Sequence, residues 1–234
     1  MNETITNRKN LIISADDFGI SPLANENILA LAETGKLDRV AVMPYGSFAT
    51  GEIEKLLASG VKLDLHLDCE QEIQKERKLK SGVITRSILF FIKYFFGKIS
   101  APVMELEWEK QLEKFYQLFG RYPDGLNSHQ HIHFLPAYFK VMLRMAQKNN
   151  IRFVRFGKKG LIKSASKVYQ ILKWLRKKDA NLFIASSLDS SDYVISLDWI
   201  KNMDKFLQHL PTGTTEVVCH PERAEEFKLM QKYF

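Results

Sequence analysis

The stretch Leu11-Ile12-Ile13-Ser14-Ala15-Asp16-Asp17-Phe18-Gly19 is an apolar run that ends in two adjacent carboxylates and a glycine. The run has the length and composition of a buried strand, and the glycine after it is typical of a turn. Buried carboxylates that lie side by side repel each other, so we expect a cation beside them, most simply a divalent metal ion. The stretch therefore predicts the first strand of a sheet and a charged site at its carboxyl end.

Short apolar runs recur along the chain, and each is followed by a stretch with a helical pattern. This alternation is typical of β-α-β units and a parallel sheet. We expect a single-domain α/β protein over residues 1–234 that forms a distorted, TIM-like (β/α) barrel, with a doubly wound open sheet as the alternative. The expected strands are residues 11–15, 39–43, 61–67, 125–128, 151–156, 182–185 and 216–219. The expected helices are residues 22–34, 51–58, 85–96, 104–119, 136–148, 162–176, 197–207 and 222–232.

Length and composition limit the class of protein. With 234 residues, 45% hydrophobic and 26% charged, the chain is an ordinary globular protein with enough residues for one large core. Its two cysteines are too few for a disulfide framework and fit a reducing compartment. Residues 1–10 lack the apolar core of a signal peptide, and no apolar run reaches the length of a membrane span. We therefore expect a cytoplasmic protein.

The net charge of +7 is concentrated in two basic stretches, residues 75–98 and 158–178. The second stretch contains no acidic residue and alternates lysines with apolar residues, which predicts an amphipathic helix. Such a helix is either a solvated outer helix of the barrel or a peripheral contact with an anionic membrane surface; we do not expect nucleic acid as the partner. The first stretch belongs to an expected aromatic and basic helical insertion at about residues 70–120, which would be a lid, a substrate platform or part of the core.

Histidines follow several of the other expected strands. His66 ends one strand, His129 begins a segment with three alternating histidines after another, and His220 follows the last. The carboxyl ends of parallel strands meet at one edge of a sheet, where ligands bind. Asp17, His66 and His129 together would leave room on a divalent ion for water and substrate, with the neighbouring carboxylate free to act as a base. Taken alone, His66 would be read equally well as a core histidine, whereas three alternating histidines on an extended segment would share one face.

Two other chemistries fit less well. Cys219 and His220 are neighbours, and neighbours on a strand point apart, so they do not form a convincing nucleophile and base. The segment Gly157-Lys158-Lys159-Gly160 lacks the spacing of a nucleotide-binding phosphate loop. Metal-dependent hydrolysis remains the favoured chemistry.

These segments, in this order, resemble those of the YdjC-like carbohydrate deacetylase family, which includes ChbG-like chitooligosaccharide deacetylases and HpnK-like deacetylases of the hopanoid pathway. The matching segments are Ala15-Asp16-Asp17-Phe18-Gly19-Ile20-Ser21, His66-Leu67, Ser128-His129-Gln130-His131-Ile132-His133 and Cys219-His220-Pro221. Residues 25–35 and 135–156 also look similar, so the resemblance covers most of the chain. It implies a distorted (β/α) barrel of the glycoside hydrolase/deacetylase type and a hydrolase that removes N-acetyl groups from amino sugars.

The resemblance also implies a role for each residue. Asp17, His66 and His129 look like the ligands of one divalent ion, Mg or Zn. Asp16 looks like the general base, and His220 like a second acid or base. His131, His133 and Asn127 are expected to contact the substrate or to support the ligands. The implied partner is an N-acetylated saccharide, either an oligosaccharide or a lipid-linked glycan, and a homodimer stays open.

The sequence departs from the family pattern at three places. Asn127 stands where an aspartate is common, and Asp64 stands where a glycine is usual, with Asp68 adding a further acid nearby. The printed chain stops at Phe234, soon after Cys219-His220-Pro221, where relatives usually continue with another strand and helix. We therefore expect a short closing segment of the barrel, with an exposed sheet edge or pairing with a second subunit.

Two alternative functions remain on the sequence alone. A metal-dependent phosphoesterase would use the same carboxylates and imidazoles, and the basic stretches would suit a phosphate-bearing substrate. A non-catalytic glycan-binding or membrane-binding relative would keep the pocket without turnover, and Asn127 favours this reading. The reaction products, acetate or inorganic phosphate, separate the two enzymes.

Overall fold

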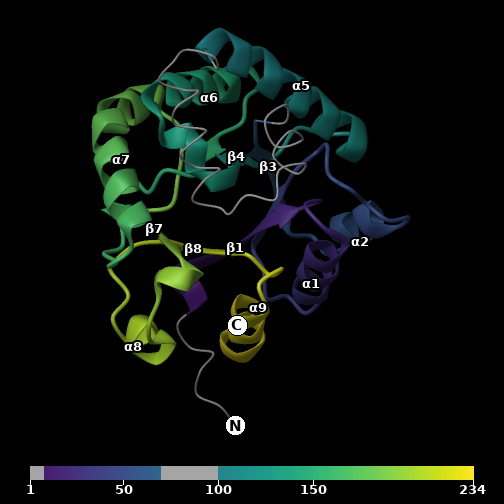
Figure 1. The fold of residues 1–234 in the computed structure, drawn as a ribbon, viewed down its shortest axis with the longest axis vertical. Coiled ribbons are helices and arrows are strands. Elements are labelled where there is room, and N and C mark those ends of the chain that lie inside the picture. Colours follow the sequence, from purple (N-terminus) through teal and green to yellow (C-terminus); the bar gives the residue numbers. More distant parts are fainter. Residues whose placement is uncertain (1–7, 70–99) are drawn as a thin grey trace.

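The computed structural model describes residues 8–69 and 100–234, which form an eight-stranded sheet covered by helices (Figure 1). All neighbouring strands are parallel, and their order is β5-β4-β3-β2-β1-β8-β7-β6. The strands are β1 (Leu11–Phe18), β2 (Arg39–Val42), β3 (Lys62–Leu67), β4 (Gly125–Ser128), β5 (Phe153–Val154), β6 (Gly160–Leu161), β7 (Tyr193–Ser196) and β8 (Thr215–Cys219). The strands progress in one direction around the sheet and β8 returns beside β1, which is the order of a (β/α) barrel.

The barrel is distorted because β5 and β6 lie at the two ends of the sheet and do not pair with each other. Near this opening, Phe153 forms a parallel bridge with Asp189, which precedes β7. The predicted distorted (β/α) barrel is therefore confirmed. A doubly wound sheet is excluded. In such a sheet the chain, after reaching one edge, would return beside β1 and then proceed outward, whereas here β6 lies at the far edge and the last strand, β8, lies beside β1.

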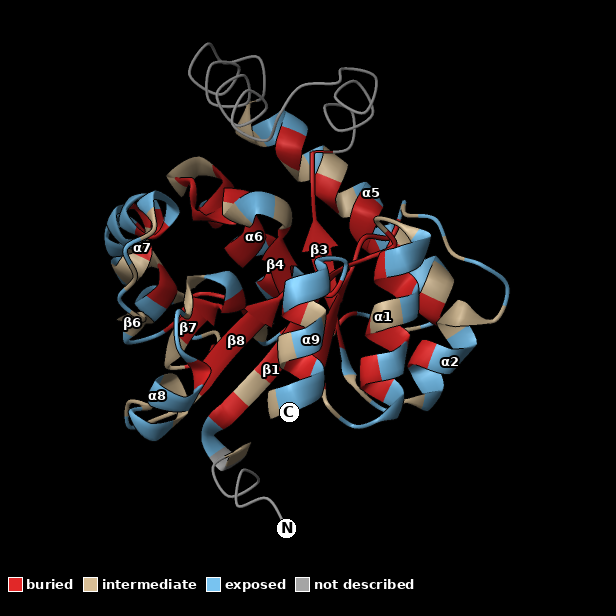
Figure 2. Cartoon of the chain, turned by 60° about the horizontal axis from the view of Figure 1, so that its bottom comes forward, coloured by how far each residue is buried: buried red, intermediate tan, exposed pale blue. Residues whose placement is uncertain are grey.

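The helices lie outside the sheet, and the strands between them are buried (Figure 2). The helices are α1 (Pro22–Glu33), α2 (Glu52–Ala58), α5 (Ala101–Phe119), α6 (Pro136–Lys148), α7 (Lys167–Ser186), α8 (Met203–Gln208) and α9 (Ala224–Tyr233), with short 3₁₀ segments at Arg8–Asn10, His129–Phe134 and Leu197–Trp199. Proline opens α1 and α6 as predicted, and the Ser21 side chain accepts a hydrogen bond from Ala24 N at the start of α1.

The interior of the barrel contains paired charges as well as apolar side chains. Arg39 of β2 and Asp64 of β3 form a two-point ion pair, and both side chains are at most 4% exposed. Gly125 of β4 leaves room for this pair, because a Cβ there would lie 2.6 Å from Arg39 Nη2 and 2.7 Å from Asp64 Oδ1. Asp64, where a glycine is usual, is thus accommodated by the cation of Arg39 on β2 and by the absence of a side chain at Gly125 on β4.

Three predicted elements in the C-terminal half are wrong. The predicted helix 197–207 is divided into the 3₁₀ segment Leu197–Trp199 and α8. Residues 182–185, predicted as a strand, belong to α7, which begins at Lys167 rather than at residue 162. The strands of this region are β6 and β7 instead. An apolar run of four residues does not by its periodicity distinguish a strand from a buried turn of helix. Phe183 in fact continues the buried face that α7 presents through Leu172 and Leu175.

The predicted helical insertion at about residues 70–120 lies mostly outside the described residues. Residues 70–99, which include the predicted helix 85–96 and its aromatic cluster, are not described. The remaining part forms α5, which contacts α2, α6 and β3. α5 therefore occupies the place of a regular barrel helix between β3 and β4.

The expected exposed edge after the last strand is wrong. β8 pairs with β1 on one side and with β7 on the other, and α9 then packs against α1. The last strand lies in the middle of the sheet, so the sheet ends at β5 and β6.

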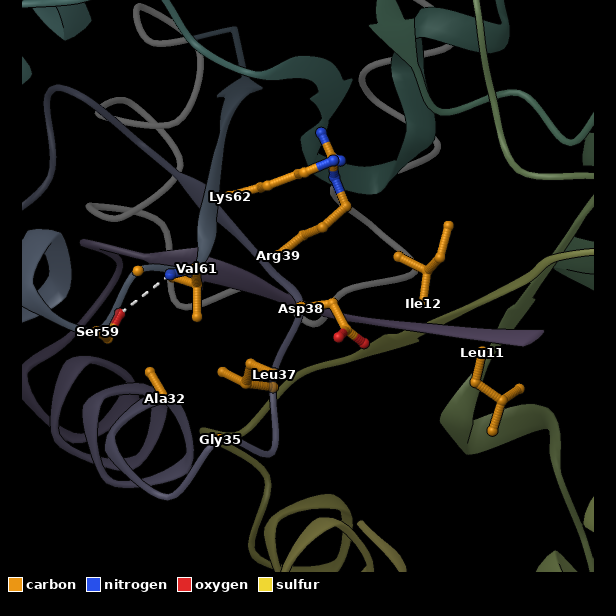
Figure 3. A pocket seen from close by; sticks show the side chains of 11 residues that line it. Leu11, Ile12, Ala32, Gly35, Leu37, Asp38, Arg39, Ser59, Val61 and Lys62 are labelled. Carbon is orange, nitrogen blue, oxygen red and sulfur yellow. Dashed lines mark hydrogen bonds between the residues drawn. The ribbon is translucent and has the colours of Figure 1, made fainter. Parts of the chain in front are cut away.

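A pocket of about 390 Å³ opens at the amino edge of the sheet, opposite the predicted site (Figure 3). It is lined by Leu11, Ile12, Ala32, Gly35, Leu37, Asp38, Arg39, Ser59, Gly60, Val61 and Lys62. Two of its charged residues already have partners, since Asp38 Oδ2 accepts a hydrogen bond from Ile13 N and Arg39 binds Asp64. Asp38 and Arg39 are therefore not free to bind a ligand in this pocket.

Asp179 gives the fold a pH dependence that can be measured. It is fully buried on α7, and neither carboxylate oxygen has a hydrogen-bond partner among the described residues. Burial raises its pKa to about 7, although Lys140 and Lys178 oppose the shift. The folded chain therefore retains a proton that the unfolded chain releases above pH 3.8, and this costs stability progressively as the pH rises towards 7.

We predict that Asp179→Asn removes this cost. The difference in unfolding free energy between variant and wild type should grow by on the order of 2–4 kcal/mol between about pH 4 and pH 8. Urea unfolding at a series of pH values measures it. The exposed exchange Glu225→Gln is the control. Parallel pH profiles of Asp179→Asn and wild type would contradict the prediction.

Candidate metal and active site

Three potential metal ligands meet at the carboxyl edge of the sheet. Asp17 lies at the end of β1, His66 at the end of β3, and His129 directly after β4. Asp17 Oδ1 lies 3.1 Å from His66 Nε2 and 2.8 Å from His129 Nδ1. All three ligand atoms lie within 4.8 Å of one another. Asp17 and His66 are buried, whereas His129 is partly exposed, so the cluster is reachable from solvent beside His129.

A β-bulge brings both neighbouring carboxylates into the site. The pairing of β1 with β2 runs from Ala15↔Val40 to Phe18↔Val42, so β1 holds one residue more than β2 over this interval. Asp17 takes a left-handed conformation with φ 73°, as one residue of a bulge often does. Asp16 and Asp17 are consequently both buried here, although consecutive residues of a regular strand would point to opposite faces.

The turn after the bulge is fixed from two sides. Gly19 N donates a hydrogen bond of 2.7 Å to Asn25 Oδ1, and Asn25 Nδ2 donates to Ser47 O. Gly19 has φ 105°, and a Cβ at this residue would lie 2.9 Å from Met43 O. Only glycine fits this close approach, so the motif Asp-Asp-Phe-Gly holds its carboxylates on a rigid turn.

Asn127 of β4 orients His66. Asn127 Oδ1 lies 2.5 Å from His66 Nδ1. An amide oxygen can only accept a hydrogen bond, so Nδ1 carries the proton and Nε2 keeps its lone pair towards Asp17. Asn127 Nδ2 is buried and has no hydrogen-bond partner in the described part of the chain. Asn127 thus fixes the ring orientation of a candidate metal ligand, although its amide carries no charge.

The donor set fits a divalent transition-metal ion. Ligand atoms at about 2.0–2.2 Å from one ion lie roughly 3–4 Å apart, which is close to the separations in this cluster. Two imidazole nitrogens and one carboxylate oxygen suit zinc and related ions, whereas magnesium prefers oxygen ligands. Three donors also leave coordination positions for water and substrate.

The charges of the cluster are coupled. Burial opposes the ionisation of Asp17, but His129 and His66 outweigh burial and hold the pKa of Asp17 well below its usual range. Burial in turn lowers the pKa of His129, but the Asp17 carboxylate raises it above 6.5. Protons therefore compete with a metal ion for His129, so metal binding weakens towards acidic pH.

Asp16 is held by Arg155, a residue that the sequence analysis did not single out. Arg155 Nη1 and Nη2 donate hydrogen bonds of 2.6 and 2.8 Å to the two Asp16 oxygens, and Nε donates one of 2.7 Å to Glu216 Oε1. All three side chains are at most 2% exposed. Burial raises the pKa of Asp16, but the Arg155 guanidinium outweighs burial and lowers that pKa to about 2. Asp16 is therefore ionised and fixed in orientation.

His220 forms a second charged pair with Glu226. His220 Nδ1 lies 3.4 Å from Glu226 Oε2, and the same oxygen accepts a 2.7 Å hydrogen bond from His220 N. Burial lowers the pKa of His220, but Glu226 and the carboxylates of Asp16 and Asp17 raise it above 6.5. The charges around His220 therefore favour its protonated form.

The three alternating histidines do not share one face, contrary to the prediction for an extended segment. His129–Phe134 forms a 3₁₀ segment, in which Gln130 and His131 have left-handed conformations with φ 53° and 56°. The segment contains no glycine, so nothing in the sequence indicated the left-handed conformations of Gln130 and His131. As a result the three side chains point to different surroundings.

His131 and His133 follow His129 on the 3₁₀ segment after β4. His133 is fully buried, and its ring bonds Ser128 Oγ at 2.6 Å and the carbonyl oxygen of Arg155 at 3.1 Å, so it steadies the segment that carries Arg155. Burial and the charge of Arg155 lower the pKa of His131 to about 3, which keeps this ring neutral. His131 Nδ1 is buried without a hydrogen-bond partner among the described residues.

Arg155, Glu216 and Glu226 are the site residues that sequence reasoning missed. Arg155 and Glu216 each lie in a run that was predicted as an apolar strand, at residues 151–156 and 216–219. A charged residue inside such a strand must find a buried partner, and that is the signal that could have identified them. Glu226 lies in the predicted helix 222–232, where an acidic residue is ordinary, so it carries no comparable signal.

Comparisons with known proteins connect this geometry to a family. The profile of a family described as YdjC-like protein matches residues 10–232. A carbohydrate deacetylase of Halalkalibacterium halodurans is 29% identical over 227 residues, which cover 92% of this chain and 86% of that protein. A carbohydrate deacetylase of Mus musculus is 28% identical over 156 residues, which cover 63% of this chain and 50% of that protein. This chain thus spans about half the length of the mouse and human relatives.

A crystal structure from Enterococcus faecalis V583, of a proposed cellobiose-phosphate cleavage protein, shares the fold. It superimposes with a TM-score of 0.58 at 18% sequence identity and covers 90% of this chain and 80% of that chain. The arrangement of strands and helices is therefore one that occurs in a solved structure.

We predict that Asn127→Ala weakens metal binding by roughly tenfold, because His66 loses the partner that orients it. Asn127→Asp should retain the affinity, since a carboxylate oxygen accepts the same hydrogen bond. Calorimetric titration of the metal-free protein with Zn²⁺ measures both, with the exposed exchange Gln170→Ala as the control. Equal affinity of Asn127→Ala and wild type would show that His66 does not need this amide.

Proposed function

This chain belongs to the YdjC-like protein family, and from this membership and the geometry of its site we propose that it is a metal-dependent hydrolase that removes N-acetyl groups from amino sugars. The observation that carries the proposal is the convergence of Asp17, His66 and His129 on one point at the carboxyl edge. Two features support the acid–base candidates: Asp16 precedes Asp17 and lies 4.0 Å from His66 Nδ1, and His220 directly follows β8, the strand that pairs with β1. The relatives named carbohydrate deacetylase and chitooligosaccharide deacetylase support the same chemistry.

Asp17, His66 and His129 would hold one divalent ion, and zinc or a related ion suits these donors better than magnesium. When bound, such an ion polarises the acetyl carbonyl and acidifies the attacking water. Asn127 keeps His66 in the tautomer that can bind the ion. Partly exposed His129 lies on the side from which an acetylated sugar would approach.

Asp16 would accept the proton of the attacking water. Its carboxylate is ionised over the whole neutral range, since its pKa is about 2. A carboxylate with so low a pKa is a weak base, so its contribution depends on position more than on basicity. Arg155 supplies that position by binding both oxygens, and Glu216 holds Arg155 from the other side.

His220 would donate a proton to the departing amine. An amine is a poor leaving group unless it is protonated, so the breakdown step needs an acid. The pKa of His220 is raised because Glu226 and the carboxylates of Asp16 and Asp17 outweigh burial, and this favours the protonated ring that such a donor needs. The two candidates thus have opposite properties: an ionised acceptor at Asp16 and a protonated donor at His220.

We propose an N-acetylated saccharide as the substrate. Acetate release from a panel of N-acetylated saccharides, including chitobiose and a lipid-linked N-acetylglucosamine, tests the activity on enzyme that was metal-stripped and then reloaded. We predict that Asp16→Asn lowers kcat by about 10²–10⁴-fold and leaves Zn²⁺ affinity within a few-fold of wild type, because Asp17, His66 and His129 are unchanged. The exposed exchange Glu225→Gln should leave turnover unchanged. Release of inorganic phosphate from phosphorylated sugars, with no acetate from any substrate, would favour a phosphoesterase instead.

A second prediction concerns the pH profile. A group that acts as an acid is active below its pKa, so kcat should fall as the pH rises through the raised pKa of His220. Glu226→Gln removes the carboxylate that raises this pKa, and the alkaline fall should therefore move to lower pH. His220→Gln should abolish the alkaline limb and lower kcat. An unchanged alkaline limb in both variants would assign the acid to another group.

A further inference from the structure

Helix α7 presents apolar side chains on its buried face and also on an exposed side next to that face. The buried face packs on the barrel through Tyr169, Leu172, Leu175 and Phe183. The outer face carries Val168, Ile171 and Trp174, which are 50%, 48% and 56% exposed. A spacing of three residues places these side chains along one side of the helix. We call these three residues the α7 stripe.

The surroundings of the α7 stripe are basic. Residues 158–178 contain no acidic residue, and the acid within α7, Asp179, is buried on the inner face. Lys167 and Lys178 are exposed on the same side of the helix as the stripe, and Lys178 Nζ lies 3.8 Å from the centre of the Trp174 ring. The stripe is therefore an apolar strip edged by positive charge.

The stripe lies on the half of α7 that is nearest to the proposed active site. α7 follows β6 and so begins at the carboxyl edge of the parallel sheet, the edge that also carries Asp17 and His66 (Figure 1). Val168, Ile171 and Trp174 fall in the first eight residues of this helix of 20 residues. A surface that contacted the stripe would therefore lie beside the opening of the barrel.

This combination fits one kind of partner. Exposed tryptophan and aliphatic side chains insert between lipid headgroups, while lysines at the same level reach anionic phosphates. Each lysine near such a surface strengthens the binding. None of the described helices is long and apolar enough to cross a membrane, so the contact would be peripheral. We propose that the α7 stripe and its flanking lysines bind an anionic membrane surface.

Such binding would present the barrel opening to substrates that are anchored in the membrane. An amphiphilic glycan, with a sugar headgroup and a lipid tail, is the substrate class that gains from this arrangement. The surface binding itself does not depend on the deacetylase proposal, and its test measures no catalysis.

Co-sedimentation with lipid vesicles tests the proposal. The full chain is mixed with vesicles of phosphatidylcholine alone or with added phosphatidylglycerol. We predict binding to the anionic vesicles that weakens with added salt. The double variant Ile171→Ser with Trp174→Ser should lose at least about tenfold in affinity, and Lys167→Glu with Lys178→Glu should do the same. Ile184→Ser is the matched control, because Ile184 is 74% exposed on α7 but lies outside the stripe.

Circular dichroism shows whether each variant is folded, and Trp174 fluorescence gives a second readout on the wild type. The chain has three tryptophans, so a blue shift of the total tryptophan emission with anionic vesicles, absent in Trp174→Ser, would support insertion of the Trp174 ring. Failure of the wild type to bind anionic vesicles would overturn the proposal. So would equal binding by the stripe variants and by Ile184→Ser. Binding to DNA in place of vesicles, with the same loss in the lysine variants, would also overturn it and assign the basic face to nucleic acid.

Discussion

One buried cation, the guanidinium of Arg155, connects the fold to the site. Its backbone belongs to the end of the sheet, where Arg155 N bonds Leu126 O just after β5. Its side chain crosses the barrel interior to Asp16 on β1 and to Glu216 on β8, in the middle of the same sheet. The sheet is open between β5 and β6, so this bridge helps to keep it curled. Loss of one partner would leave an uncompensated charge in the interior, which is far more costly than loss of an exposed pair.

Much of the site could be predicted because its residues follow strands. Asp17, His66 and His129 each end or follow an apolar run, and parallel strands must bring such residues to one edge. The structure confirms that the potential ligand atoms of these three residues lie together at this edge. Arg155 could not be placed in the same way, because its role depends on a partner across the barrel and not on its own strand. The strands β6 and β7 were missed for another reason: the periodicity of a short apolar run does not distinguish a strand from a buried part of a helix.

Local backbone geometry is the other part that the sequence concealed. Asp17, Gln130 and His131 all adopt left-handed conformations without being glycine. Such conformations cost free energy and persist only where the surroundings enforce them, which is common at functional sites. In this chain they decide which way the carboxylate and imidazole side chains point. The motifs thus predicted that Asp17, His66 and His129 converge, while the direction of His131 and His133 depended on turns that propensities do not reveal.

The bulge in β1 has a consequence for how this strand can change over time. Up to Ala15 the strand is in step with β8, and beyond it the extra residue shifts the strand by one position relative to β2. Loss of a single residue between Ala15 and Phe18 would remove one of the two carboxylates, and gain of one would displace Asp16 relative to Asp17. Selection must therefore preserve the length of this segment as strictly as the identity of Asp16 and Asp17. The number of residues in β1 is therefore as important for the site as their identity.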